Sequence, residues 1–215
     1  MGTWDQLLRK IQEGEGMHLE FKMKTSNVEK IMQEMVAFAN TEGGSLLIGV
    51  SDNGELKGVK YPEEDIFIIQ KMMSRFIQPQ IGFDLSVHPI SSKRSVIHLQ
   101  IHESIKKPHF YYADSNSPGV VFIRLKDECL KASTEIYRLL KMKRRSKGQF
   151  ITLGEIERHL LKLFEGRKEW TLSEILKSTK IKKRQASFTI VKLAAAGVLE
   201  IIPRSGKEDL IRELA

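Results

Sequence analysis

The sequence predicts a mixed α+β domain followed by a smaller helical domain that ends in a strand pair. The first observation is that a helical pattern stops at Gly43-Gly44 and an apolar strand, 46–50, begins at once. The second is that residues 18–24 alternate between apolar and polar side chains, which is the period of a strand. The third is a basic, polar run at 141–148 with little apolar surface to bury, where we expect a linker. The predicted domains are therefore 1–143 and 144–215.

Periodicity and turn residues place the elements of the first domain. Apolar residues at helical spacing predict helices, and short apolar or alternating runs between turn signals predict strands. We expect, in order, helix 5–12, strand 18–24, helix 28–40, strand 46–50 with a hairpin ending near Gly58, helix 63–76, strands 83–87, 95–101 and 120–125, and a helix capped by Ser133 that closes the domain.

Strand 18–24 presents two different faces. Alternation turns its apolar side chains toward a core and its charged ones to the other side. The predicted core face is Leu19, Phe21 and Met23, and the polar face is His18, Glu20, Lys22 and Lys24.

The junction between helix 28–40 and strand 46–50 has an unusual backbone requirement. Gly43 and Gly44 can adopt the left-handed and extended conformations that end a helix without a Cβ clash. We expect the backbone amides there to lie open, and Asn40, Gly43 and Gly44 are therefore candidate phosphate contacts. A purely structural turn is the alternative, and the sequence contains no G-x-x-x-x-G-K-[ST] motif for a nucleoside triphosphate.

Three motifs in this order resemble the Schlafen AlbA-type domain, over roughly the first two thirds of the chain. They are Glu15-Gly16-Met17-His18-Leu19-Glu20-Phe21-Lys22, then Phe38-Ala39-Asn40-Thr41-Glu42-Gly43-Gly44, and Ile48-Gly49-Val50-Ser51-Asp52-Asn53-Gly54 with Gly58. The resemblance implies nucleic-acid binding, because similar domains occur as DNA-binding parts of bacterial regulators and, in Schlafen proteins, in a nuclease that cleaves structured RNA. One departure is that Arg124 matches, whereas the glycine- and serine-rich segment expected after it is absent.

The same resemblance implies a candidate metal site. By position, Glu15, Glu20 and Asp52 match three carboxylates that bind divalent metal in the RNA-cleaving Schlafen proteins, so Mg²⁺ or Mn²⁺ would be the cofactor of a nuclease. The alternative is that all three are solvated or turn residues. Lys22, next to Glu20 on one strand face, is either a nucleic-acid contact or its ion-pair partner.

The second domain has the outline of a winged helix. Helices 156–164, 172–178 and 182–196 precede a strand at 198–203 and a return strand at 209–214. The third helix would enter the DNA major groove by its N-terminal part. The candidate DNA contacts are Lys182, Lys183, Arg184, Gln185 and Ser187, with Arg204 and Lys207 on the wing. A winged helix used for protein contact is the alternative.

Composition agrees with a polyanionic partner. The 215-residue chain has a net charge of +8 and an isoelectric point near 9.5. Its single cysteine, Cys129, excludes an intrachain disulfide, and no apolar run approaches the ~20 residues of a membrane span. We therefore expect a cytoplasmic protein with no membrane partner.

These patterns favour a DNA-binding transcriptional regulator, with no cofactor required and a homodimer as the expected assembly. DNA is the expected partner, with RNA the alternative. Two other interpretations stay open: a metal-dependent nuclease acting on RNA or DNA, and a non-catalytic protein-interaction adaptor.

Overall fold

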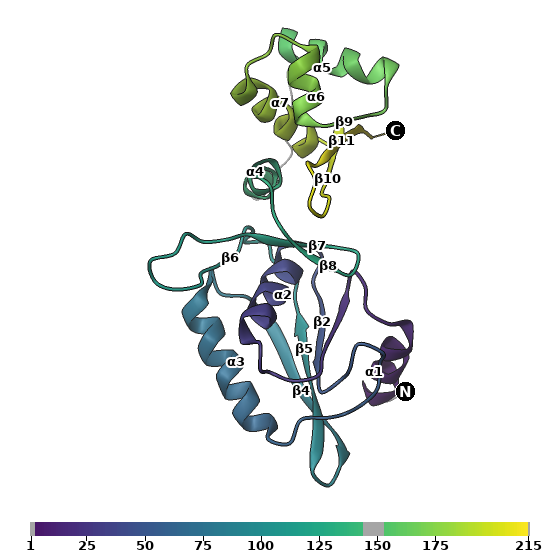
Figure 1. Ribbon diagram of the computed structural model, residues 1–215, viewed down its shortest axis with the longest axis vertical. Coiled ribbons are helices and arrows are strands. Elements are labelled where there is room, and N and C mark those ends of the chain that lie inside the picture. The colour runs from purple at the N-terminus through teal and green to yellow at the C-terminus, as the bar shows by residue number, and fades with distance from the viewer. Residues whose placement is uncertain (1–2, 144–152, 215) are drawn as a thin grey trace. The chain divides into compact units, whose positions relative to one another are not determined.

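The computed structural model describes residues 3–143 and 153–214, and the chain divides into two compact units, Met1–Lys131 and Ala132–Ala215 (Figure 1). The first unit is mixed α+β and the second is mainly helical, as the sequence predicts. No helix in the described part of the chain combines the length and hydropathy of a bilayer span.

The first unit is built around a four-stranded sheet with the order β1-β2-β5-β4. β1 and β2 are parallel and are connected through α2, whereas β5 pairs antiparallel with both β2 and β4. Two short ribbons, β3-β6 and β7-β8, complete the unit. Its elements are α1 (Thr3–Glu13), β1 (Leu19–Lys22), α2 (Val28–Asn40), β2 (Gly44–Ile48), α3 (Pro62–Phe76), β3 (Ile77–Gln78), β4 (Phe83–Ser91), β5 (Arg94–Ile101), β6 (Phe110–Tyr111), β7 (Phe122–Leu125) and β8 (Glu128–Lys131).

Helices cover both faces of this sheet. Leu46 and Ile48 of β2 pack with α2 and α3, whereas Leu47 packs with α1 on the opposite face (Figure 1). A strand buried on both sides needs apolar residues at every position, which is why residues 46–50 are continuously apolar. The prediction of a doubly covered strand here is confirmed.

Strand β1, at the edge of the sheet, differs from its prediction at two positions, Met23 and Glu20. Leu19 and Phe21 are buried as expected, but Met23 follows the strand and is 47% exposed. Glu20, predicted to lie on a polar face, is only 6% exposed. It pairs in register with Leu46, so it points to the face that α2 covers.

Two loops also differ from the sequence prediction. The hairpin expected after β2 contains no regular strand pair. It has one isolated antiparallel bridge, between Val50 and Leu56, and the amides of Lys57 and Gly58 both donate to the Gly49 carbonyl. A Cβ on Gly49, whose φ is +98°, would lie 2.9 Å from the Gly58 Cα. The segment after Arg124 was not predicted to be a strand. Its residues Glu128–Lys131 form β8, which pairs antiparallel with β7.

The second unit contains four helices and a three-stranded antiparallel sheet among its described residues. Thr171 caps α6 in a reciprocal capping box with Glu174. The sheet order is β10-β11-β9. The elements are α4 (Thr134–Lys143), α5 (Glu155–Gly166), β9 (Glu169–Trp170), α6 (Leu172–Ser178), α7 (Lys183–Ala195), β10 (Leu199–Ile202) and β11 (Leu210–Glu213).

The boundary between the units falls before α4, whereas the sequence placed it after this helix. The Ser133 hydroxyl caps α4 as expected, accepting from the Ile136 amide at 3.1 Å. The helix then packs against α7 of the second unit. An apolar stripe shows that a helix needs a partner but does not say which one. Residues 144–148 of the predicted linker lie outside the described residues.

Candidate functional site

The polar centre of the first unit is a buried charge cluster formed by Glu20, Lys22, Glu34 and Arg124. One guanidinium nitrogen of Arg124, Nη1, lies 2.9 Å from Glu20 Oε2 and 2.5 Å from Glu34 Oε2. The Lys22 ammonium contacts the other Glu20 oxygen, Oε1. The cluster therefore joins β1 and α2, which are neighbours in the sequence, to β7, which is distant from both.

Arg124 is also fixed by uncharged groups. Its Nη2 donates to the Gly16 carbonyl at 2.6 Å, its backbone amide donates to the Thr41 hydroxyl at 2.9 Å, and its guanidinium carbon lies 4.7 Å from the centre of the Phe38 ring. A planar guanidinium with several donors suits such a site better than an ammonium. Arg124 is thus the residue that ties the β7-β8 ribbon to the sheet.

Sequence reasoning missed Glu34 as a member of this cluster. The available signal was its spacing, since Glu34 lies three residues after Ile31 and four before Phe38, on the apolar side of α2. A lone acid on a buried helix face requires a cationic partner, and a lone arginine within an apolar strand could have supplied it.

Burial dominates the electrostatics of the cluster. Desolvation raises the pKa of Glu34 above its usual 4.5, the charge of Glu20 adds to the rise, and Arg124 opposes it. The pKa of Glu15 is raised by burial as well, against a hydrogen bond from the Phe21 amide, and the charges of Glu20 and Asp52 raise it further. The carboxylates of the predicted metal site therefore interact electrostatically, but the site already contains two cations, Lys22 and Arg124.

The described residues do not form the predicted metal site. Both oxygens of Glu20 are held by Lys22 and Arg124, and Oε1 of Glu15 accepts from the Phe21 amide at 2.8 Å. Asp52 lies exposed in a tight turn closed by Gly54 and Ser51. In the described parts of the chain, no group of three acidic, histidine or cysteine side chains is arranged to hold a cation. The donor set is matched to internal cations, so it does not fit Mg²⁺ or Mn²⁺ in this arrangement.

The predicted phosphate contacts at the end of α2 are buried structural groups. The Asn40 amide donates to the carbonyls of His109 and Phe122 and accepts from the His109 amide. The Gly43 amide donates to the Phe38 carbonyl at 2.9 Å. Gly44 is buried as well, and a Cβ there would overlap the Phe38 ring. Of the two interpretations of this junction, the structure favours the structural turn.

The N-terminal end of α7 presents an exposed basic surface, which we call the α7 basic face. Its members are Lys182, Lys183, Arg184 and Gln185. These four residues are consecutive and go most of the way around the helix, so they share its N-terminal end and not one side. Further along α7, Ile190 and Leu193 are fully buried. Packing therefore covers the later turns of α7 and leaves its N-terminal end exposed.

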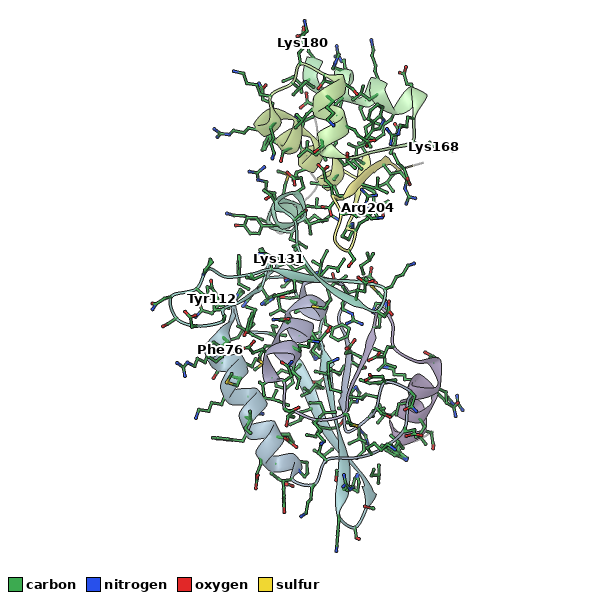
Figure 2. The ribbon with its side chains drawn as sticks, viewed as in Figure 1. Phe76, Tyr112, Lys131, Lys168, Lys180 and Arg204 are labelled. Carbon is green, nitrogen blue, oxygen red and sulfur yellow. The ribbon has the colours of Figure 1, made fainter. Side chains whose placement is uncertain are left out.

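Two of the predicted DNA contacts are engaged in other interactions. The Ser187 hydroxyl is buried, accepting from Arg138 Nη1 at 2.6 Å and donating to Glu135 Oε1 at 2.5 Å, so it joins α7 to α4. Arg204, on the loop between β10 and β11 (Figure 2), donates from Nε to the Glu208 carbonyl at 2.7 Å. Lys207 on the same loop is exposed.

Sequence reasoning also missed two exposed side chains next to the α7 basic face. Lys180 lies in the turn before α7 (Figure 2), and Phe188 is 56% exposed. Phe188 follows Arg184 by four residues, so helical spacing places both on one side. That spacing was the signal that could have identified Phe188.

Comparisons with known proteins agree with the resemblance of the first unit. The family profile of the Schlafen AlbA_2 domain matches residues 15–133. A similar solved structure is the N-terminal domain of a RecG-related protein, a candidate ATP-dependent DNA helicase, of Nitrosomonas europaea, with 19% identity, a TM-score of 0.42, and coverage of 72% of this chain and 97% of that one. Another is the DIP2311 protein of Corynebacterium diphtheriae, with 13% identity and a TM-score of 0.46.

The alignment with DIP2311 covers 98% of this chain but only 49% of the other, so the chain spans about half the length of that protein. At these TM-scores the family match is the informative comparison, and it covers more than half of the chain, from Glu15 to Ser133. It supports nucleic-acid binding in general. The chain belongs to the Schlafen AlbA_2 family.

Proposed function

We propose that this protein is a DNA-binding transcriptional regulator that contacts duplex DNA through a winged helix at residues 155–213. The observation that carries the proposal is the α7 basic face, which is exposed while the later turns of the helix are buried in the core of the unit. The order of α5, α6 and α7 followed by the β10-β11 pair supports it, and in this proposal α7 is the recognition helix and the β10-β11 loop is the wing.

Within this proposal the side chains have different roles. Arg184 can donate two hydrogen bonds to a guanine edge, and Gln185 can donate one and accept one on an adenine edge, whereas Lys182 and Lys183 act on phosphates. Lys207 adds a phosphate contact from the wing. Ser187 is not included, because its hydroxyl already bridges α4 and α7.

The test is a salt titration of duplex binding by fluorescence anisotropy. Each cation that contacts a phosphate contributes about −0.9 to the slope of log K against log salt for duplex DNA. We expect Lys183→Ala/Arg184→Ala to weaken binding and to make that slope shallower by about 0.9, because only Lys183 of the two is assigned to a phosphate. The matched control is Arg158→Ala/Lys162→Ala, which removes the same two residue types from the exposed side of α5. Equal losses in both variants, or none in either, would refute the assignment of α7 as the recognition helix.

The regulator proposal also includes a homodimer, since two copies of α7 can then read two half-sites about one helical turn apart. Selection of binding sites from random duplexes should yield inverted repeats, and light scattering should give twice the mass of one chain. A monomer that selects single half-sites would remove the dimer from the proposal. Failure to retain any duplex or RNA in dilute buffer would instead favour a protein-interaction adaptor.

A further inference from the structure

The first unit contains a groove that the buried charge cluster does not use, which we call the α3 groove. It lies between residues 23–26, residues 57–61, the first turns of α3 and Arg94. Its volume is about 620 Å³, within the ~300–1,000 Å³ range typical of small-ligand sites. The α3 groove is open to solvent. All of its lining residues belong to the first unit, so its shape does not depend on the second unit.

Cations outnumber carboxylates along the α3 groove. Lys24, Lys57, Lys60 and Arg94 line it, against Glu64 and Asp65. Arg94 is oriented by donating from Nη1 to the carbonyls of Lys57 and Gly58, at 3.2 and 2.8 Å. Lys57 also pairs with Glu55 at 2.5 Å, and Asp65 accepts from the Thr25 hydroxyl. Lys24, Lys60 and Arg94 are therefore the cations best placed to receive an anion.

An aromatic platform lies among these cations. Tyr61 is 53% exposed, and the Lys60 ammonium lies 4.9 Å from the centre of its ring. Met23 and Ile68, both partly exposed, add apolar surface to the same groove. An exposed ring with cations beside it is the arrangement by which proteins bind unpaired bases, because the ring stacks on a base while the cations neutralise the flanking phosphates.

We propose that the α3 groove binds single-stranded nucleic acid, with a base stacked on Tyr61 and the flanking phosphates on Lys24, Lys60 and Arg94. This proposal rests on the nucleic-acid binding expected of the first unit and defines which form of nucleic acid that unit takes. A paired base cannot stack on a side chain without leaving its neighbours, so the groove prefers unpaired strands to a duplex.

The experiment measures fluorescence anisotropy of labelled oligothymidylate and oligouridylate of about 20 nucleotides, a length that spans a typical single-strand site. The protein is the full chain carrying Lys183→Ala/Arg184→Ala, so that α7 does not contribute. We expect Tyr61→Ala to weaken binding about tenfold and Tyr61→Phe to retain it. Lys24→Ala/Lys60→Ala should reduce the salt slope by about 1.4, since each single-strand phosphate contact contributes about 0.7.

Two controls separate a stacked base from general charge attraction. An oligonucleotide of abasic sites keeps the phosphates but has nothing to stack, so Tyr61→Ala should not weaken its binding further. Lys106→Ala/Lys126→Ala removes two exposed cations of the first unit that lie outside the groove. Equal losses in this control, or a Tyr61→Ala variant that binds like its parent, would overturn the groove assignment.

The outcome is independent of the α7 test. If single strands fail to bind while duplex DNA still depends on Lys183 and Arg184, the α3 groove proposal fails and the regulator proposal stands. If single strands bind through Tyr61 while duplex binding does not depend on Lys183 and Arg184, the regulator proposal fails and the α3 groove proposal stands. Binding of free thymidine monophosphate as tight as that of the strand would show a mononucleotide site instead and would also overturn the proposal.

Discussion

The buried charge cluster and the α7 basic face use similar side chains for opposite purposes. In the cluster, Lys22 and Arg124 face Glu20 and Glu34 inside the protein, and their charges are neutralised there. On α7, Lys183 and Arg184 face solvent. The net charge of +8 therefore does not tell which cations are available to a ligand, because a cation is available only where no carboxylate is packed against it.

The energetic consequences of the two arrangements also differ. A buried ion pair gains little over apolar residues of similar shape, but removing one partner leaves an uncompensated charge that is expensive to bury. Removing an exposed cation changes the free energy of unfolding by less than about 0.5 kcal/mol. The comparison therefore predicts losses of stability when the buried charge cluster is changed and losses of binding when the α7 basic face is changed.

The largest expected effect is that of Arg124→Met. The variant leaves Glu20 and Glu34 without their shared partner, so we expect the free energy of unfolding to fall by about 3–5 kcal/mol in a urea titration. Arg9→Met, at an exposed position of α1, should change it by less than about 0.5 kcal/mol. A loss in Arg124→Met no larger than in Arg9→Met would show that the cluster is not a stabilising unit.

Asn40→Ala should have the next largest effect. It removes the amide that joins the end of α2 to His109 and Phe122, and leaves buried backbone groups without a partner. We expect a loss of about 3 kcal/mol in thermal or urea unfolding. Asn116→Ala, in an exposed loop, is the control. If Asn40→Ala instead kept full stability and lost nucleic-acid binding, the phosphate-contact interpretation would be restored.

Ser187→Ala tests a residue of α7 that was predicted to contact DNA but makes buried contacts with α4. Because its hydroxyl links Arg138 to Glu135, we expect a loss of about 1 kcal/mol in unfolding and unchanged DNA affinity of the folded protein. Ser178→Ala on α6 provides the comparison. A variant of normal stability with weakened DNA binding would place Ser187 among the DNA contacts after all.

The smallest expected effect is a pH dependence. Burial raises the folded-state pKa of Glu34 above 4.5, so the folded state binds more protons at this site than the unfolded state between the two pKa values. The stability due to its protonation is full below the unfolded pKa and is lost as pH rises through the folded pKa. The free energy of unfolding of the unsubstituted protein, minus that of Glu34→Gln, should therefore fall with rising pH and then level off. A difference that rises with pH would contradict the stated shift.

The sequence was most informative where local patterns are strong. The periodicity of 28–40 and 63–76 placed α2 and α3 to within one residue, and the cap residue Ser133 was identified correctly. Strand 120–125 was predicted and contains β7, whereas its partner β8 was missed because a four-residue strand carries little periodic signal. Met23 was assigned to the core by alternation, but the strand ends before it.

The candidate sites were predictable only in part. Lys183, Arg184 and Gln185 could be named because they begin the third helix of a predicted winged helix, the part that enters the major groove in such domains. Glu15, Glu20 and Asp52 could be selected by type and position, but not their contacts. Whether a carboxylate meets a metal, a lysine or an arginine depends on segments that are distant in sequence.

The sequence by itself determined the order of the elements, the family of the first unit and the exposed basic end of α7, since each depends on neighbouring residues or on short motifs. Only the tertiary structure decided that Arg124 reaches Glu20 and Glu34 across the fold, that α4 packs on α7, and that separate segments enclose the α3 groove around Tyr61. The physical reason is that burial and charge neutralisation are properties of contacts between distant segments, and no local pattern records them.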